Sequence, residues 1–322
     1  MLMRPAVSVI IPTCNRAAMV GVAIASVIAQ RTAEGELSFE LIVIDDGSTD
    51  STWRELERTA AMVNRASGER LTMRIERTEN RGVAAARNCG VALAAAPLIA
   101  LLDSDDCWGP DKLARQVAYM SAHPEYAIAQ TDEWWVRDGV RVNPPPRHRK
   151  RAGDIFVDSL RTCLVTPSTV MIRNATLREV GGFDEDLTAA EDYDLWLRIL
   201  VRHEIGYLAE YHATRHAGHR GQLSATVPAI DRFRILALIK LLGGHELNAM
   251  RRGAVCDVLA EKCAIYAQGL MRRGRGEVAQ LILGFAAEAE GAWRVDGAQP
   301  SAIAAAAAMR ARIRRDGGVS GA

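Results

Sequence analysis

Short apolar runs alternate with stretches of helical periodicity through the first hundred residues of the chain. Runs rich in β-branched side chains predict strands over 7–12, 39–44, 71–76 and 99–102. The segments between them predict helices over 17–30, 51–64 and 83–95. The strands are continuously apolar instead of alternating, which is typical of a parallel sheet covered by helices on both faces. The first third of the chain is therefore predicted to be an α/β domain.

The pattern changes after Trp108. A helix is expected over 110–122, and the Asp138-Gly139 turn predicts a hairpin within 127–142. Further expected elements are strands over 166–172 and 207–211 and a helix over 190–203. The segment 144–151 has the sequence Pro-Pro-Pro-Arg-His-Arg-Lys-Arg. Its three prolines exclude regular structure, so we predict a basic, mobile loop.

From residue 226 onward the composition is almost wholly helix-forming. Helices are expected over 230–242, 247–272, 277–289 and 301–314, with a frayed end over 316–322. Helices of this kind can form a small bundle, and homo-oligomerisation through them is one role that we consider.

Composition narrows the class of protein. The chain has 322 residues and a formal net charge of +1, which gives no indication of nucleic-acid binding. Its six cysteines form no CxxC pair and suit a reducing compartment. We find neither a signal peptide nor an apolar run long enough to span a bilayer. We therefore expect a cytoplasmic protein, with peripheral contact at the inner face of a membrane left open.

Carboxylates crowd the end of the fourth predicted strand, where Asp103, Asp105 and Asp106 follow Leu102. Like charges a few Å apart repel, and a divalent cation with oxygen ligands, Mn²⁺ or Mg²⁺, relieves that repulsion. The alternative is a solvated acidic turn that caps the next helix. Residues 12–16 and 45–50 are two more polar clusters at strand ends, and the carboxyl ends of such strands are where open α/β sheets bind ligands.

Five motifs then occur in a recognisable order. They are Val9–Arg16, Ile42–Asp50, Asn80–Gly90, Leu101–Asp106, and Gly181–Asp184 followed by Glu191–Arg198. Together they resemble family 2 glycosyltransferases with the GT-A fold, over roughly residues 5–225. The resemblance implies a mostly parallel sheet flanked by helices, with a glycosyltransferase domain over 1–225 and an α-helical C-terminal region over 226–322. Within that domain, 1–108 is the expected nucleotide-binding half and 109–225 the acceptor half.

The resemblance also implies a donor, a nucleoside-diphosphate sugar, with a UDP-sugar favoured. The acceptor is expected to be a glycan, a lipid-linked sugar or another molecule, as in cell envelope polysaccharide biosynthesis. Cys14 departs from the family, which usually has a tyrosine there that stacks on the base. The residues implied in donor binding are Pro12, Thr13, Cys14, Arg16, Asp45, Asp46, Arg87, Asp103, Ser104 and Asp105.

The DxD region of the family can be aligned in two ways. Asp103 and Asp105 form a literal DxD, while Asp105 and Asp106 form an adjacent pair. Asp105 belongs to both and is the first expected metal ligand. The resemblance also makes His216 or His219 a candidate to complete the metal site and Arg215 or Arg220 a candidate to hold a phosphate oxygen, the alternative being a surface loop. By the same resemblance, Asp192 is the base of an inverting transfer, with Glu191 as the second candidate. The alternative for both acids is stabilisation of a helix start.

Two other functions remain open. A nucleotidyltransferase has a similar sheet, although the turn after the first strand lacks glycine. A non-catalytic nucleotide-sugar-binding module would lack the acceptor-side acids. The cations between Arg147 and Arg151 suit either an anionic acceptor or solvent. Trp134 and Trp135 are neighbours in a predicted strand, so we expect at most one of them to line an acceptor cleft.

Overall fold

The computed structural model describes residues 4–31, 37–66, 70–218, 227–244, 247–294, 308–309 and 311–313. The chain forms two compact units, each built from separate stretches of sequence. The first comprises Met1–Ile155, Leu164–Thr188 and His203–Gln222, and the second comprises Phe156–Cys163, Ala189–Arg202 and Leu223–Ala322. The boundary expected at residue 225 stays a prediction.

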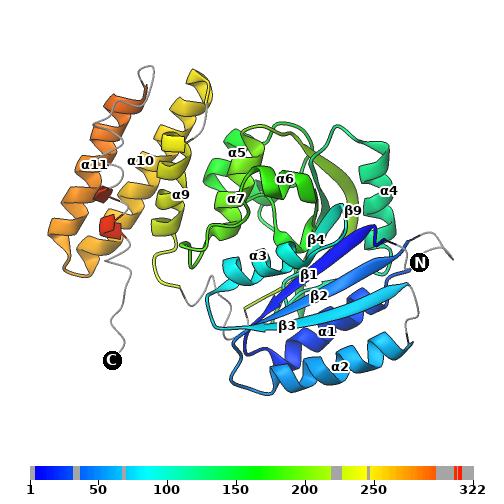
Figure 1. Ribbon diagram of the computed structural model, residues 1–322. Coiled ribbons are helices and arrows are strands. Elements are labelled where there is room, and N and C mark those ends of the chain that lie inside the picture. The colour runs from blue at the N-terminus through cyan, green and yellow to red at the C-terminus, as the bar shows by residue number, and fades with distance from the viewer. Residues whose placement is uncertain are drawn as a thin grey trace. The chain divides into compact units, whose positions relative to one another are not determined.

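The first unit begins with the parallel sheet that the apolar runs predict (Figure 1). Its strands, in spatial order, are β3 (Leu71–Thr78), β2 (Phe39–Asp46), β1 (Val7–Thr13) and β4 (Leu98–Leu101). The connecting helices are α1 (Ala17–Ile28), α2 (Thr52–Ala66) and α3 (Val83–Leu93). Every predicted strand and helix of this part is confirmed, within a few residues at the ends.

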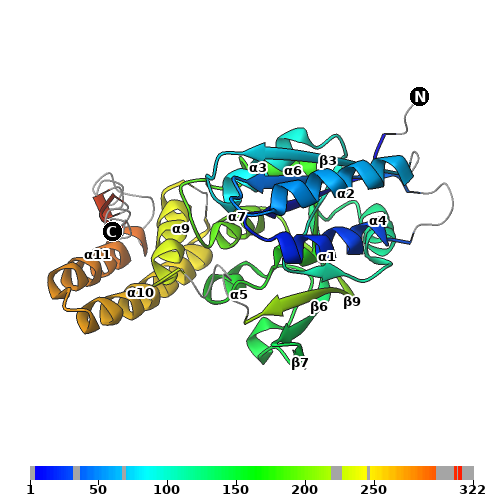
Figure 2. The same cartoon turned by 90° about the horizontal axis from the view of Figure 1, so that it is seen from below.

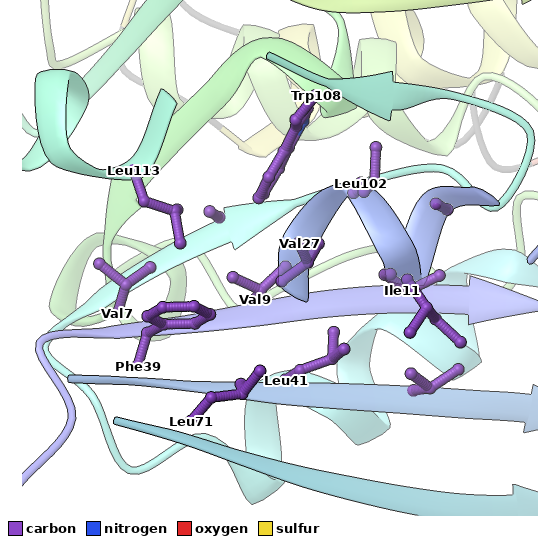
Figure 3. Close-up of a cluster of buried hydrophobic side chains, with 14 of the residues drawn as sticks. Val7, Val9, Ile11, Val27, Phe39, Leu41, Leu71, Leu102, Trp108 and Leu113 are labelled. Carbon is purple, nitrogen blue, oxygen red and sulfur yellow. The ribbon is translucent and has the colours of Figure 1, made fainter. Parts of the chain in front are cut away.

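Alternate residues of β1 face opposite sides of the sheet. Val7, Val9 and Ile11 belong to a buried cluster with Val27 of α1, and Figure 3 shows these side chains together with those of Phe39 and Leu41. Ile10 points to the other face. There Gly90 of α3 packs so closely that a Cβ on the glycine would lie 2.5 Å from Ile10 Cγ2. Helices therefore cover both faces, which explains why β1, β2 and β4 read as continuous apolar runs. The expectation of a continuous apolar run is wrong for β3, which lies at the sheet edge and exposes Thr72 and Arg74.

Beyond β4 the sheet becomes mixed. β8 (Val170–Arg173) is antiparallel to β4, β6 (Ile128–Arg137) is antiparallel to β8, β9 (Ile205–Ala217) is parallel to β6, and β5 (Cys107–Trp108) is antiparallel to β9. β7 (Val140–Val142) forms the predicted hairpin with β6 (Figure 2). β9 is much longer than the strand expected over 207–211. The two-residue strand β5 was not predicted, because pairing over so short a length leaves no periodicity.

Shorter helices complete the first unit. They are α4 (Lys112–Ala122), α6 (Asn174–Glu179) and the 3₁₀ turns Pro146–His148 and Pro167–Thr169. The strand predicted over 166–172 therefore begins as a 3₁₀ turn, because Pro167 suits the first position of a helix. The segment 144–151 was predicted to be a mobile loop without regular structure, and this prediction is wrong in two respects. The segment contains one 3₁₀ turn, and the side chain of Lys150 is buried instead of mobile in solvent.

Every regular element that the structure describes in the second unit is a helix. It contains α5 (Phe156–Arg161), α7 (Glu191–Leu200), α9 (Asp231–Gly244), α10 (Ala249–Arg272) and α11 (Gly276–Arg294). Three of the predicted C-terminal helices are thus confirmed, while α5 was missed. The helix expected over 301–314 lies mostly outside the described residues, and the end expected to fray over 316–322 lies wholly outside them. Within the described ranges, we find no helix with both the length and the apolar character needed to traverse a bilayer.

Candidate functional site

The loops after β1 and β2 are joined by hydrogen bonds. Asn15 adopts a positive φ of 52°, and its Oδ1 accepts from Thr49 N at 2.8 Å and from Asp50 N at 3.2 Å. In return, Ser48 Oγ accepts from Asn15 N at 2.8 Å. Asparagine tolerates the left-handed region, and its short amide reaches neighbouring backbone groups. The polar clusters at 12–16 and 45–50 therefore form one connected edge of the sheet.

Asp45 and Asp46 lie at this edge, and both are buried. Asp45 Oδ1 accepts from Ser48 N at 3.2 Å, and its Oδ2 lies 3.3 Å from Arg77 Nε. Asp46 accepts from the backbone N–H groups of Arg81 and Gly82, at 2.9 and 2.8 Å, where α3 begins. A carboxylate at a helix N-terminus satisfies otherwise unpaired donors and the helix dipole. Asp46 therefore has a structural task that its motif does not reveal.

Cys14 occupies the position where the family usually has a tyrosine. Its Sγ lies 3.3 Å from Asn80 Nδ2. Burial raises the pKa of the Cys14 thiol, and the carboxylates of Asp46 and Asp45 raise it further. A thiol of raised pKa is a poorer nucleophile at neutral pH. Pro12 and Thr13 are buried at the end of β1, next to Cys14.

Each carboxylate of the acidic strand end has its own partner. Asp103 Oδ1 lies 2.7 Å from Arg87 Nη2, and Asp105 Oδ2 lies 3.0 Å from Arg16 Nη1. Asp106 is buried, and its Oδ2 accepts from Ser168 Oγ at 2.6 Å. The structure thus brings two predicted donor-binding arginines, Arg16 and Arg87, to the predicted DxD region, although they lie far apart in sequence.

His216 joins the same cluster from β9, whereas the other candidates His219 and Arg220 lie outside the described residues. Its backbone N–H donates to Asp106 Oδ1 at 2.9 Å, and its Nδ1 lies 3.0 Å from the Asp105 carbonyl oxygen. A carbonyl oxygen accepts and cannot donate, so Nδ1 carries the proton. In the neutral imidazole, Nε2 then presents a lone pair. This is the tautomer of a histidine that binds a metal ion through Nε2.

Asp106 is buried beside the two other carboxylates of the cluster. Burial raises the pKa of Asp106 well above its ordinary value, and the neighbouring carboxylates of Asp103 and Asp105 raise it further. A cation nearby would relieve this destabilisation of the charged form. The described residues bring no three His, Cys, Asp or Glu side chains into a ready metal-binding group. Mg²⁺-type sites that use one or two carboxylates and complete their shell with waters and substrate phosphates need no such group, so the residues present fit one. Ser104, between Asp103 and Asp105, is buried.

Glu191 and Asp192 lie in the second unit, at the start of α7. Glu191 is buried and Asp192 is half-buried. Asp192 Oδ1 accepts from Tyr193 N at 2.7 Å, and its Oδ2 lies 3.8 Å from Cys163 Sγ. Ala190, directly before them, has a φ of 58°, which alanine rarely adopts. Strained backbone of this kind is common at functional sites.

Sequence reasoning missed one member of the acidic cluster. Ser168 Oγ both donates to Asp106 Oδ2 and accepts from Asp103 N at 3.2 Å. It lies in the 3₁₀ turn before β8, more than sixty residues from the carboxylates. No signal in the sequence marks it, because the contact exists only once β8 pairs with β4.

Residues 8–181 match the family model described as Glycosyl transferase family 2. The chain belongs to this family. The GT-A fold expected from the five motifs is confirmed by similarity to two solved structures, whose sequences are 17% and 20% identical to this chain. They are S. aureus TarS 1–349 in complex with UDP-GlcNAc and the mannosyltransferase PcManGT from Pyrobaculum calidifontis in complex with GDP-Man and Mn²⁺. The match to TarS has a TM-score of 0.65 and covers 96% of this chain and 92% of TarS 1–349. The match to PcManGT has a TM-score of 0.59 and covers 96% of this chain and 79% of PcManGT.

Curated relatives of this family 2 chain carry related names. An uncharacterized glycosyltransferase of Rickettsia felis is 32% identical over 200 residues. The match covers 62% of this chain but only 31% of the Rickettsia protein. The succinoglycan biosynthesis protein ExoU of Rhizobium meliloti is 32% identical, with 77% of this chain and 73% of that one covered. WfaP of Escherichia coli, a UDP-Glc:alpha-D-GlcNAc-diphosphoundecaprenol beta-1,3-glucosyltransferase, is 28% identical, with 73% and 90% covered.

Proposed function

We propose that the protein transfers a sugar from a nucleoside-diphosphate sugar to a lipid-linked or glycan acceptor, with a divalent metal and with inversion. The observation that carries the proposal is the cluster at the end of β4. Asp103, Asp105 and Asp106 meet Arg16, Arg87 and His216 there, from four separate parts of the chain. An arrangement of carboxylates and guanidinium groups suits a ligand that brings both a cation and phosphate oxygens.

Asp105, with either Asp106 or His216, would hold Mn²⁺ or Mg²⁺, and waters and donor phosphate oxygens would complete the shell. When bound, the cation would neutralise charge on the departing diphosphate. Arg16 and Arg87 keep the carboxylates of Asp105 and Asp103 oriented until donor binds. Asp45 remains the proposed contact to the base, at the same sheet edge.

Asp192 is the proposed general base. It would take the proton of the acceptor hydroxyl while the hydroxyl oxygen attacks the anomeric carbon, opposite the breaking bond to the diphosphate. The outcome is an inverted anomeric centre. Half-exposure of the Asp192 carboxylate is compatible with access by an acceptor, whereas the buried Glu191 carboxylate is less accessible, which favours Asp192 over Glu191.

The names of the relatives guide the choice of substrate. WfaP is named for a UDP-glucose donor and a diphosphoundecaprenol-linked acceptor, and TarS was crystallised with UDP-GlcNAc. We therefore favour a UDP-sugar and a lipid-linked acceptor here. PcManGT, with GDP-Man and Mn²⁺, makes a GDP-sugar the rival donor.

Donor hydrolysis across UDP-, GDP- and dTDP-sugars with Mn²⁺ tests the proposal. We expect one class of donor to be turned over and EDTA to stop the reaction. Asp105→Asn should raise the Mn²⁺ concentration needed for half-maximal turnover by about tenfold or more. Asp111→Asn, an exposed acid that pairs with Arg31, is the matched control and should leave it unchanged. If no donor is bound or turned over and EDTA has no effect, the proposal is wrong.

The other proposals are tested separately. A nucleotidyltransferase would release pyrophosphate from a nucleoside triphosphate and a sugar phosphate, and a binding module would bind donor without turnover. Homo-oligomerisation through the C-terminal helices is tested by native mass spectrometry of the full chain. A cytoplasmic location and peripheral membrane contact remain predictions that fractionation of cells would examine.

A further inference from the structure

Ser168 holds the segment 103–108, which contains all three carboxylates of the acidic cluster. The Ser168 hydroxyl donates to Asp106 Oδ2 at 2.6 Å and accepts from Asp103 N at 3.2 Å. The carbonyl oxygen of Ser168 accepts from Trp108 Nε1 at 2.7 Å. Ser168 is itself buried. One residue of the 3₁₀ turn before β8 therefore contacts the acidic segment near its beginning, at Asp106 and at its end.

Two buried ammonium groups fix this turn. Lys112 Nζ donates to the Thr169 carbonyl oxygen at 3.2 Å, and Lys150 Nζ donates to Thr169 Oγ1 at 3.2 Å. Both lysines are buried, and Gln116 Nε2 donates to the same carbonyl oxygen at 3.0 Å. Buried polar networks whose members are bonded in this way rigidify the backbone that they contact. The Ser168 hydroxyl is therefore presented to the acidic segment from a fixed place.

Both oxygens of the Asp106 carboxylate accept hydrogen bonds from groups that cannot turn away. Oδ2 accepts from the Ser168 hydroxyl, and Oδ1 accepts from the backbone N–H of His216 in β9 at 2.9 Å. The first donor is held by the turn, and the second belongs to the backbone of a strand. Asp106 is only 6% exposed. Asp106 is therefore better suited to join the turn to β9 than to bind a cation.

Asp105 and His216 are placed differently. The Asp105 side chain is 18% exposed and pairs with Arg16, a guanidinium on a flexible stem that is 19% exposed and can rotate when a cation arrives. His216 Nδ1 donates to the Asp105 carbonyl oxygen at 3.0 Å, which directs the Nε2 lone pair away from that bond. Asp106 thus fixes the backbone of His216, and the Asp105 carbonyl fixes its ring.

We propose that Ser168 and Asp106 are positioning residues, which hold Asp105 and His216 in place as the protein ligands of the divalent cation. This inference rests on the proposed function, since it assigns roles within that metal site. Residues that orient a metal ligand typically change the metal affinity by about 10- to 100-fold when they are removed. Ser168 exerts this effect from a turn more than sixty residues away in sequence.

Binding of Mn²⁺ in the presence of UDP, measured from the electron paramagnetic resonance signal of free Mn²⁺, tests this without any turnover. Ser168→Ala should weaken Mn²⁺ binding about tenfold or more. Ser159→Ala is the matched control, because Ser159 is also buried and its hydroxyl has no hydrogen-bond partner among the described residues. It should leave Mn²⁺ binding unchanged. Thermal unfolding of both variants ensures that binding is compared between folded proteins.

Substitutions of Asp106 separate positioning from ligation. Asp106→Asn keeps an oxygen for the His216 N–H, so it should weaken Mn²⁺ binding less than either Asp106→Ala or Asp105→Asn. Cysteine variants give a second measurement, because a thiolate ligand favours soft cations such as Cd²⁺. Asp105→Cys should shift the preference of the site from Mn²⁺ towards Cd²⁺. Asp106→Cys should keep the preference of the unchanged protein.

Three results would overturn the inference. Equal Mn²⁺ binding by Ser168→Ala and Ser159→Ala would mean that Ser168 has no positioning role. A loss in Asp106→Asn as large as that in Asp105→Asn, or a gain of Cd²⁺ preference in Asp106→Cys, would make Asp106 itself a ligand. If the unchanged protein binds Mn²⁺ and turns over a donor while any of these occurs, this inference fails alone. If it neither binds Mn²⁺ with UDP nor turns over a donor, the proposed function fails instead.

Discussion

The ammonium group of Lys240, on α9, donates a hydrogen bond to the Asp194 carboxylate on α7, with the two atoms 3.1 Å apart. Arg198, one turn further along α7, reaches the same Oδ2 atom through Nε at 2.8 Å and Nη2 at 2.7 Å. Asp194 is buried, and both cations contact its carboxylate. The helix that begins with Glu191 and Asp192 is thereby tied to the C-terminal helices within the second unit.

The two cations should differ in how much stability they contribute. Arg198→Met leaves a buried carboxylate with less compensation and should lower the free energy of unfolding by about 3–5 kcal/mol. Lys240→Met removes one bond from a side chain that is 26% exposed and should cost about 1–2 kcal/mol. Urea denaturation of the two variants measures this. Equal losses would contradict the view that Arg198 is the principal partner.

Asp192→Asn should abolish sugar transfer while donor affinity stays within about twofold. The substitution removes the proposed base but keeps the size of the side chain and an oxygen that can accept from Tyr193 N. Transfer assays and donor titration by calorimetry give the two quantities. Glu191→Gln is the comparison, and we expect it to retain more activity. A large loss of donor binding in Asp192→Asn would instead indicate a structural role.

Ala190→Gly should leave stability nearly unchanged, because two effects oppose each other. Glycine relieves the strain of a positive φ, about 1–2 kcal/mol for alanine. Against this stand unfolded-chain entropy worth roughly 0.5–1 kcal/mol and the loss of a buried methyl group worth about 0.8 kcal/mol. Ala189 is also buried but has no positive φ, so Ala189→Gly has the same two costs without the relief. It should cost about 1.5 kcal/mol. Thermal unfolding distinguishes them, and similar losses would argue against strain at Ala190.

Glu210 should contribute stability that depends on pH. Its hydrogen bond with Arg115 lowers the pKa of Glu210 to about 2, with a smaller contribution from His212. A depressed carboxyl pKa stabilises the fold above the ordinary value of 4.5, and this stabilisation is lost as the pH falls from 4.5 towards 2. Glu210→Gln should therefore lower the urea midpoint at pH 7 and lower it less at pH 3.

Glu57→Gln, on the exposed face of α2, is the control for Glu210→Gln. Its effect should be small at both pH values. A difference between Glu210→Gln and the unchanged protein that is the same at pH 7 and pH 3 would mean that the Arg115 contact does not depend on the charge of Glu210.

Local sequence pattern was sufficient for the first half of the sheet and for the long C-terminal helices. β1, β2 and β4 are buried on both faces, so their apolar runs carry a clear signal, whereas β3 lies at the edge of the sheet and alternates between buried and exposed residues over its first four positions. Local pattern does not predict a strand whose existence or length depends on pairing with a strand distant in sequence. β5 consists of two residues held by β9, and the full length of β9 depends on its pairing with β6 across two register shifts.

The candidate site, too, could be predicted only where the local sequence was sufficient. The motifs locate Asp103, Asp105 and Asp106 because these residues lie at a strand end, where side chains of that type are conspicuous. They do not reveal that Asp46 holds the start of α3, that Ser168 bonds to Asp106, or that Lys150 is buried against Glu133. Each of these contacts joins segments separated by seventeen or more residues, and single-sequence periodicity contains no information at that range.

The second unit is assembled from stretches that leave the ribosome at different times. Lys240 and Arg251, which donates to the Val201 carbonyl at 2.7 Å, follow Leu200 by 40 and 51 residues. At about 5–20 residues per second, the helix with Asp192 and Asp194 waits seconds during synthesis for its countercharge and its covering helices. A nascent chain that stops before α9 would therefore expose the proposed base on an incompletely packed helix, and activity should emerge only after the C-terminal third has been translated.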